Sequence, residues 1–319
     1  MSKRTVCTAI AVVTALVLGG PKAQAGIRVG VLGDSYSDEY QFYSPHRSKA
    51  RNWVEILAST RDVDFGEFRS SSWSEPRNQG FAFNWAKSGA TTTSMIADKQ
   101  HEGLAAQVAR GEVAVAVVFV GGNDFIEALK SSDPRSRLNG LGRSAFANIQ
   151  MAIDTLLTAS PNVKLIVATV PDIRELPEFR DALKQGKLDP SFAALAAAET
   201  EIFNAEIRRL QTAGGRVACF DFASFSRVSQ LISPRHLTVG GRKVERERVG
   251  NTPDRLFLGD SRHLGTLAQG LLAKYMAEAL NRSCDAKIKP LAEHELVQLA
   301  DRVTEPAIAS TLKEDGARP

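Results

Sequence analysis

The sequence predicts an α/β protein built on a doubly wound parallel sheet. Apolar runs bounded by turn residues recur along the chain, and runs this continuous are typical of strands that helices cover on both faces. Helical patterns lie between these runs, and strands that alternate with helices form βαβ units. The chain has no repeat and no Pro/Ser-rich linker, so we expect one large domain among its 319 residues.

The expected strands and helices follow one another in a regular order. Four of the apolar runs read IRVGVL, VAVAVVFV, VKLIVATV and RVACF, and a shorter, less regular run brings the expected sheet to about five strands. Ligands of such sheets bind beyond the carboxyl ends of the strands, so we expect the chemistry in the loops that follow them. The strands are expected at 27–32, 62–68, 113–120, 163–170 and 216–220, and the helices at 51–60, 98–110, 143–159, 195–213 and 264–280.

The first 25 residues have the pattern of a secretory signal peptide. Lys3 and Arg4 precede an apolar segment at 6–18, and Ala23-Gln24-Ala25 fits an A-x-A cleavage site. The apolar segment is short for a membrane span, although a retained N-terminal anchor is the alternative. We therefore expect residues 1–25 to be removed and the mature protein to be secreted or periplasmic.

The charge balance excludes several classes of partner. The chain has 40 Lys and Arg residues against 36 Asp and Glu residues, and Lys3, Arg4 and Lys22 lie in the expected signal peptide. The remaining chain is nearly neutral, so it has no electrostatic footprint for nucleic acid. No second apolar run approaches membrane-spanning length, and we expect no stable membrane insertion after cleavage.

Cys219 and Cys284 remain after the expected cleavage, and two states are open to them. A disulfide in an oxidising compartment would close a long loop and contribute about 4 kcal/mol in the chain-entropy model. Alternatively, Cys219 in the apolar run RVACF is a buried thiol. No C-x-x-C motif or His/Cys spacing indicates a metal site, and no metal or cofactor is expected.

Ser35 and Gly89 lie in two loops that suit ligand binding. Ser35 belongs to a Gly-Asp-Ser sequence after the first expected strand, where Gly33 lets the backbone turn sharply and expose the hydroxyl. The alternative is that Asp34 or Ser35 only caps the next helix. Gly89, in NWAKSGATT, has no side chain to block a ligand, but it also fits an ordinary turn.

Two further loops carry an amide and an Asp–His pair. Asn123 follows the strongest apolar run, where its side-chain N–H could face a substrate or form an Asx turn. Asp260 and His263 are spaced i, i+3 before the last helical pattern, and such residues are neighbours in a turn of helix. The carboxylate could thus fix the tautomer of the imidazole. The alternative is an N-capping aspartate beside a surface histidine.

Together and in this order, the four loops resemble those of the GDSL or SGNH hydrolase family. The resemblance rests on GDSYSDEY, NWAKSGAT, GGNDF and DSRH, and it extends from about Arg28 to Asn281. The segment VATVPDI at 167–173 is also similar to the fourth strand of the family and its following loop. Tyr36 stands where many members have leucine, which could alter the floor of the pocket.

The resemblance implies a three-layer, flavodoxin-like fold and a metal-independent serine hydrolase without a cofactor. Ser35 would be the nucleophile, His263 the general base and Asp260 the residue that orients it. The backbone N–H groups of Ser35 and Gly89 and the side-chain amide of Asn123 would form the oxyanion hole. The substrate would be a small-molecule, lipid or glycan acyl ester. A non-catalytic carbohydrate- or lipid-binding module of the same fold is the alternative.

Other motifs do not compete with this interpretation. Ser35 is followed by Ser37, so the G-x-S-x-G sequence of the α/β-hydrolases is missing. The GLGRSA sequence at 140–145 follows a polar segment instead of a strand, which argues against a dinucleotide site. We expect the catalytic domain at 26–282, with 234–258 either an active-site flap or a surface loop. Residues 283–319 are expected to form a polar tail with a short helix at 291–301.

Overall fold

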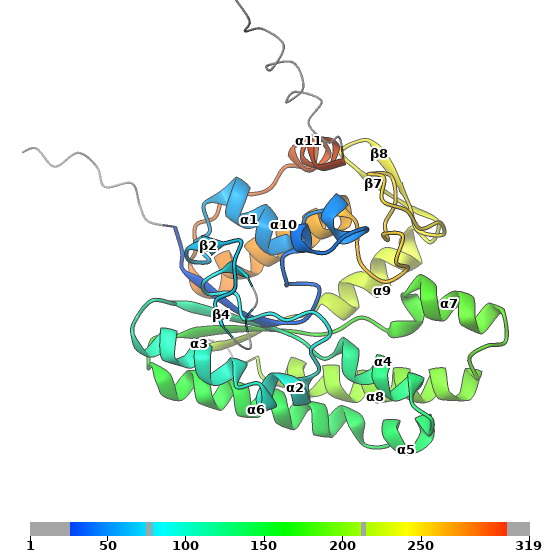
Figure 1. The fold of residues 1–319 in the computed structure, drawn as a ribbon, viewed down its shortest axis with the longest axis horizontal. Helices are drawn as coiled ribbons and strands as arrows, with labels where there is room; N and C mark the ends of the chain where they lie inside the picture. The colour runs from blue at the N-terminus through cyan, green and yellow to red at the C-terminus, as the bar shows by residue number, and fades with distance from the viewer. Residues whose placement is uncertain (1–25, 75–76, 78, 212–214, 305–319) are drawn as a thin grey trace, which may run out of the picture.

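A parallel sheet of four strands forms the centre of the computed structural model, which describes residues 26–74, 77, 79–211 and 215–304 (Figure 1). The strand order is β1-β4-β5-β6, and every neighbouring pair is parallel. β1 and β4 are buried along their whole length because helices cover both faces. The predicted doubly wound α/β fold is therefore confirmed. The strands are β1 (Val29–Gly33), β4 (Val115–Phe119), β5 (Lys164–Ala168) and β6 (Val217–Phe220).

The expected fifth strand at 62–68 does not join this sheet, so the prediction of about five strands is corrected to four. Pairing does begin, because the Val29 N–H donates to the Asp64 carbonyl at 2.8 Å. Gly66, with a φ of +84°, then turns the chain away before a ladder can form. A separate antiparallel pair follows, made of β2 (Phe68–Arg69) and β3 (Gly80–Phe81).

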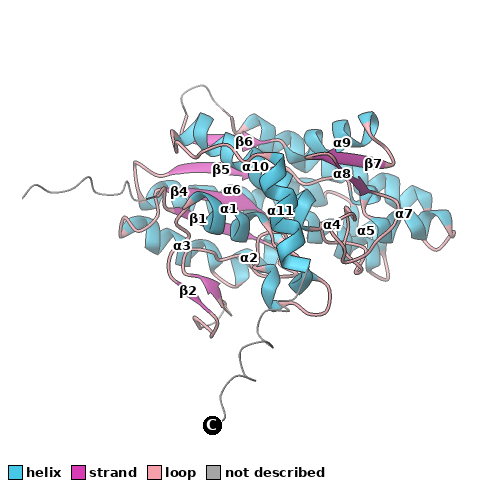
Figure 2. Ribbon diagram, turned by 90° about the horizontal axis from the view of Figure 1, so that it is seen from above, coloured by secondary structure: helices cyan, strands magenta, loops and turns pink. Residues whose placement is uncertain are grey.

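Helices form a layer on each face of the sheet (Figures 1 and 2). α1 and α10 cover one face, and α3, α6 and α8 cover the other. α1 starts where the sequence favours it, because Asn52 and Glu55 form a capping box. All five correspond to predicted helical patterns, and their bounds are α1 (Trp53–Arg61), α3 (Gln100–Ala109), α6 (Leu141–Ala159), α8 (Pro190–Arg209) and α10 (Thr266–Cys284).

Shorter helices follow the carboxyl ends of the strands and build the rim of the sheet. α4 follows β4, a 3-10 turn and α7 follow β5, and α9 follows β6. These elements are α2 (Thr92–Ala97), α4 (Gly122–Lys130), α5 (Pro134–Leu138), α7 (Pro177–Lys184), α9 (Phe222–Ile232) and the 3-10 turns Tyr40–Phe42, Arg47–Lys49 and Ile173–Glu175.

The C-terminal third adds a hairpin and a last helix. The hairpin of β7 (His236–Val239) and β8 (Arg242–Glu245) occupies part of the expected flap, and its Gly240 N–H donates to the Glu293 carboxylate at 2.9 Å. α11 (Glu293–Thr304) contains the predicted helix at 291–301, and it buries Leu296 against α10. The expected signal peptide at 1–25 and the end of the tail at 305–319 lie outside the described residues.

The structure has Cys219 and Cys284 as free, half-buried thiols, which answers the question the sequence left open. Burial raises the pKa of each thiol to about 11. Of the helices in the described ranges, none has the combination of length and hydropathy that a membrane crossing requires.

Candidate active site

Ser35 is held in a tight turn at the end of β1. The Asp34 carbonyl accepts hydrogen bonds from Ser37 and Asp38, and the Asp34 carboxylate accepts one from the Tyr36 N–H at 2.9 Å. Gly33 is required by close approach, since a Cβ at this position would lie 2.8 Å from the Cβ of Ser37. The sharp turn thus presents the Ser35 side chain at the carboxyl edge of the sheet, as the sequence predicts.

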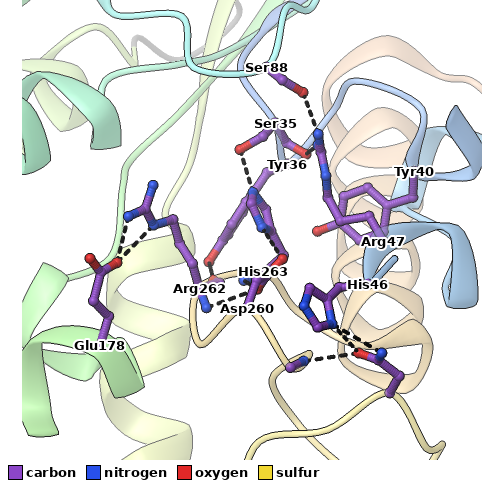
Figure 3. A network of polar contacts seen from close by, with 12 residues as sticks. Ser35, Tyr36, Tyr40, His46, Arg47, Ser88, Glu178, Asp260, Arg262 and His263 are labelled. Atoms are coloured by element: carbon purple, nitrogen blue, oxygen red, sulfur yellow. Dashed lines mark hydrogen bonds and ion pairs between the residues drawn. The ribbon is translucent and has the colours of Figure 1, made fainter. Parts of the chain in front are cut away.

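His263 lies between Ser35 and Asp260 (Figure 3). Its Nε2 is 2.7 Å from the Ser35 Oγ, and its Nδ1 is 2.8 Å from Asp260 Oδ2. Because a carboxylate only accepts hydrogen bonds, Asp260 fixes the tautomer with the proton on Nδ1 and leaves Nε2 free to accept from the serine hydroxyl. The structure therefore brings three predicted site residues into one hydrogen-bonded chain.

The local fold of the Asp–His pair differs from the predicted turn of helix. Phe257 and Leu264 pair across a tight loop, which the Leu258 N–H closes by donating to the His263 carbonyl at 2.7 Å. Ser261 adopts a φ of +63° at its tip. The Asp260 carboxylate also accepts the His263 backbone N–H at 2.9 Å, so the loop itself fixes the pair.

Burial and hydrogen bonding set the charges of the pair. Burial lowers the pKa of His263, and it outweighs the nearby Asp260 carboxylate, which acts in the opposite direction. The imidazole is consequently neutral at neutral pH. Burial acts against the Asp260 carboxylate as well, but the hydrogen bonds from His263 prevail and lower the pKa of Asp260 to about 2. The pair thus rests as a neutral base beside a carboxylate.

Three N–H donors lie around the same edge. Within the described part of the chain, the backbone N–H groups of Ser35 and Gly89 donate no hydrogen bond. Gly89 has a φ of +83°, which favours glycine, and a Cβ there would meet only open space. Asn123, in the first turn of α4, donates one amide hydrogen to the Ala90 carbonyl at 3.0 Å, which leaves its second amide hydrogen without a partner.

A buried arginine that the sequence analysis did not single out connects two of these loops. The Arg47 guanidinium donates to the Ser35 carbonyl at 3.3 Å and to the Ser88 Oγ at 2.8 Å (Figure 3). The Asp38 carboxylate accepts from the Ser88 N–H and hydroxyl at 2.7 and 2.5 Å, and also from Tyr43. Arg47 lies in a 3-10 turn with no periodic pattern, so its sequence carries no signal for this role.

A small apolar cavity opens beside the Ser35 side chain. Its volume is about 40 Å³, and Ser35 and Asn123 lie in its wall. Arg262 also lines it, held by the Glu178 carboxylate, which the Arg262 Nε approaches to 3.0 Å. The apolar part of the wall consists of Phe119, Ile126, Val170, Pro171, Ile173 and Leu176.

The fold and the site define an α/β enzyme whose reacting groups stand at the carboxyl edge of a parallel sheet. The model of the GDSL-like Lipase/Acylhydrolase family matches residues 29–276. The chain belongs to this family, which confirms the resemblance seen in the sequence, and it is an ester-hydrolysing enzyme.

Solved structures share this architecture. The lipase Lip_vut3 from a goat rumen metagenome aligns with a TM-score of 0.50 at 13% identity, over 79% of this chain and 97% of that one. A phospholipase A1 from Streptomyces albidoflavus gives 0.43 at 15% identity, over 82% and 99%. A family 3 carbohydrate esterase from Clostridium thermocellum gives 0.42 at 16% identity, over 86% and 98%. The comparison with curated proteins found no match.

Proposed function

We propose that the protein is an exported serine esterase that cleaves carboxylic esters through an acyl-serine intermediate. The observation that carries the proposal is the continuous chain of hydrogen bonds from Asp260 through His263 to Ser35. A serine hydroxyl is a weak nucleophile by itself, and an adjacent neutral base that a carboxylate orients is the arrangement that activates it.

In the proposed first step, the Ser35 Oγ attacks the ester carbonyl carbon while its proton moves to the His263 Nε2. The carbonyl oxygen becomes an anion in the tetrahedral intermediate, where the N–H groups of Ser35, Gly89 and Asn123 stabilise it. His263 then returns the proton to the leaving alcohol as the C–O bond breaks. The Asp260 carboxylate stabilises the imidazolium throughout.

In the second step, a water molecule gives its proton to His263 and attacks the acyl-serine. Collapse of this second intermediate releases the acid and restores the Ser35 hydroxyl. The apolar cavity of about 40 Å³ beside Ser35 favours a short acyl group in this position. The alcohol part of the ester would then lie on the solvent side, where a lipid, glycan or small alcohol can be accepted.

A fluorophosphonate probe tests the nucleophile directly. The protein should be labelled once per chain, with the adduct at Ser35, and Ser35→Ala should not be labelled. Because Ser37 lies in the same turn, Ser37→Ala is the matched control and should keep its label. Labelling at another serine, or none in a folded sample, would contradict the proposal.

Export is the other part of the proposal, and it rests on the basic start, apolar segment and A-x-A sequence of residues 1–25. In a host with a general secretory pathway, the processed protein should begin at Gly26. Intact-mass measurement of the protein outside the cytoplasm checks this. A full-length cytoplasmic product would exclude export in that host.

A further inference from the structure

A second cavity lies on the other side of the Asp260–His263 loop from Ser35. Its volume is about 60 Å³, which exceeds the roughly 10–15 Å³ that one water molecule needs. α7, α9, α10 and the β7–β8 hairpin contribute to its wall, and Figure 1 shows α9 lying between α10 and α7 with the hairpin beside it. Much of the wall is apolar and includes Phe222, Phe225, Leu237, Leu256, Phe257 and Leu264.

Arg246 supplies a buried cation to this cavity. The residue is only 9% exposed, and its Nη2 donates to the Ser229 Oγ. Its Nε is buried and has no hydrogen-bond partner in the described part of the chain. A buried donor without a partner is costly, and for a charged group the cost is larger. The guanidinium is therefore poised for an acceptor that the protein itself does not provide.

The charges around Arg246 favour an anion as this acceptor. Arg180 also lines the cavity and donates to the carbonyls of Arg246 and Glu247, at 3.3 and 3.0 Å. Glu175 is the acid in the wall, and it accepts from Ser226. Burial raises the pKa of Glu175, which favours its neutral form. Two guanidinium groups thus face one carboxyl group.

We propose that this cavity binds a small organic carboxylate with an apolar body. The carboxylate would accept hydrogen bonds from Arg246, and the carbon chain would pack against the aromatic and aliphatic wall. A charge-assisted hydrogen bond to a guanidinium is among the strong polar contacts in proteins. The inference takes from the proposed function only that hydrolysis of an ester releases such an acid.

The position of this cavity connects it with the active site. Phe257 and Leu264, which pair at the base of the Asp260–His263 loop, both belong to its wall. Phe222 packs edge-on against Phe119 of the acyl cavity, with ring centroids 5.6 Å apart. A bound acid therefore contacts the supports of both catalytic elements without touching Ser35.

Butyrate is the probe, because its three-carbon chain suits a cavity of about 60 Å³. Isothermal titration and ligand-observed NMR should detect butyrate on the wild-type protein and on Ser35→Ala, whereas butyramide should bind much more weakly. Arg246→Met, which keeps the length of the side chain, should weaken butyrate roughly tenfold or more. Arg227→Met is the matched control, because Arg227 is an exposed arginine on α9 outside the cavity wall.

A second variant protects the test if Arg246→Met does not fold. Ala268→Leu fills the cavity while Arg246 remains, and it should also abolish butyrate binding. Equal affinity for butyrate and butyramide, or unchanged binding in both cavity variants, would overturn the proposal. So would a loss confined to Ser35→Ala, because it would place the acid in the active site.

Ester hydrolysis is measured on the same samples to separate the two proposals. If the wild-type protein binds butyrate through Arg246 but cleaves no ester, the proposed function fails and the carboxylate site stands. If it cleaves esters and binds no butyrate, the carboxylate site fails alone. An Arg246→Met variant that only shifts the preferred acyl chain length would show that the cavity extends the acyl pocket, which also overturns the proposal.

Discussion

At the scale of single residues, His263 shows how burial prepares a base. Burial lowers its pKa, so the neutral imidazole persists to more acidic pH than that of a free histidine. We expect kcat/KM to fall in acid with an apparent pKa below 6.5, the usual value for histidine. A pH–rate profile measures it, and a midpoint above 7 would contradict the assignment. His263→Ala should lower kcat by ~100- to 10,000-fold, and added imidazole should restore part of the loss.

Asn123 tests the oxyanion hole. Asn123→Ala removes one donor and should lower kcat by ~100- to 1000-fold, with a smaller change in KM, because the donor matters most when the carbonyl oxygen carries charge. Asn123→Asp should be worse, since a carboxylate repels the oxyanion. Asn148→Ala is the control, because Asn148 donates to Thr93 at 3.3 Å on α2 and lies outside the acyl cavity. Near-normal kcat in both Asn123 variants would make it a turn residue.

Arg47 is expected to act as a positioning residue, because it joins the Ser35 carbonyl to Ser88, next to Gly89. Arg47→Met should lower kcat and the rate of fluorophosphonate labelling while KM changes little, and Arg47→Lys should recover part of the loss. Arg51→Met is the control, since this nearby arginine is partly exposed and donates to the Ala50 carbonyl. Equal labelling rates in the Arg47 and Arg51 variants would assign Arg47 a purely structural role.

At the scale of elements, local signals in the sequence predicted the strands, the long helices and the order of the site loops. The run at 62–68 has the composition of a strand, but Gly66 breaks its pairing with β1, and only the tertiary fold reveals this. The β7–β8 hairpin did carry a signal that the sequence analysis missed. Gly240 and Gly241 connect two short segments, and both have positive φ, as a two-residue hairpin turn requires.

These two glycines test how α11 docks. A Cβ on Gly240 would lie 2.9 Å from the Glu293 carbonyl oxygen, whereas a Cβ on Gly241 would meet no atom within 4 Å. Both substitutions to alanine strain a positive φ, which costs about 1–2 kcal/mol. Gly240→Ala should therefore reduce the free energy of unfolding more than Gly241→Ala does. Urea denaturation measures both, and equal losses would argue against close packing of the hairpin on α11.

At the scale of the whole molecule, the parallel sheet explains why distant segments form one site. β1 and β4 end at the same edge, so Ser35 and Asn123 meet there although many residues separate them. This much follows from the alternation of strands and helices in the sequence. The network around Arg47 does not, because its partners come from three loops whose relative positions depend on the packing of the entire domain.

The same edge also buries several carboxyl groups, which sets the pH dependence of stability. Burial raises the pKa of Asp34 to about 7, that of Glu39 to about 8 and that of Asp124 to about 6. In the unfolded chain these groups titrate near pH 4, so between pH 4 and 8 the folded state binds more protons. Stability should therefore fall as the pH rises through this interval. His263 acts in the opposite direction below pH 6.5, but it is one group against three.

We therefore expect the melting temperature to be higher near pH 5.5 than near pH 8.5, although activity requires the neutral imidazole and increases in that direction. Asp34→Asn keeps an oxygen that can accept from the Tyr36 N–H but cannot ionise, so it should flatten the dependence. Asp154→Asn, at an exposed position on α6, should leave it unchanged. Scanning calorimetry from pH 5 to 9 gives all three profiles. A wild-type melting temperature that rises toward pH 8.5 would mean that the buried carboxyl groups do not control stability. An unchanged slope in Asp34→Asn would assign that control to Glu39 and Asp124. In the expected case, the protein gives up stability at the pH where its base works best, because the turn that exposes Ser35 also buries Asp34.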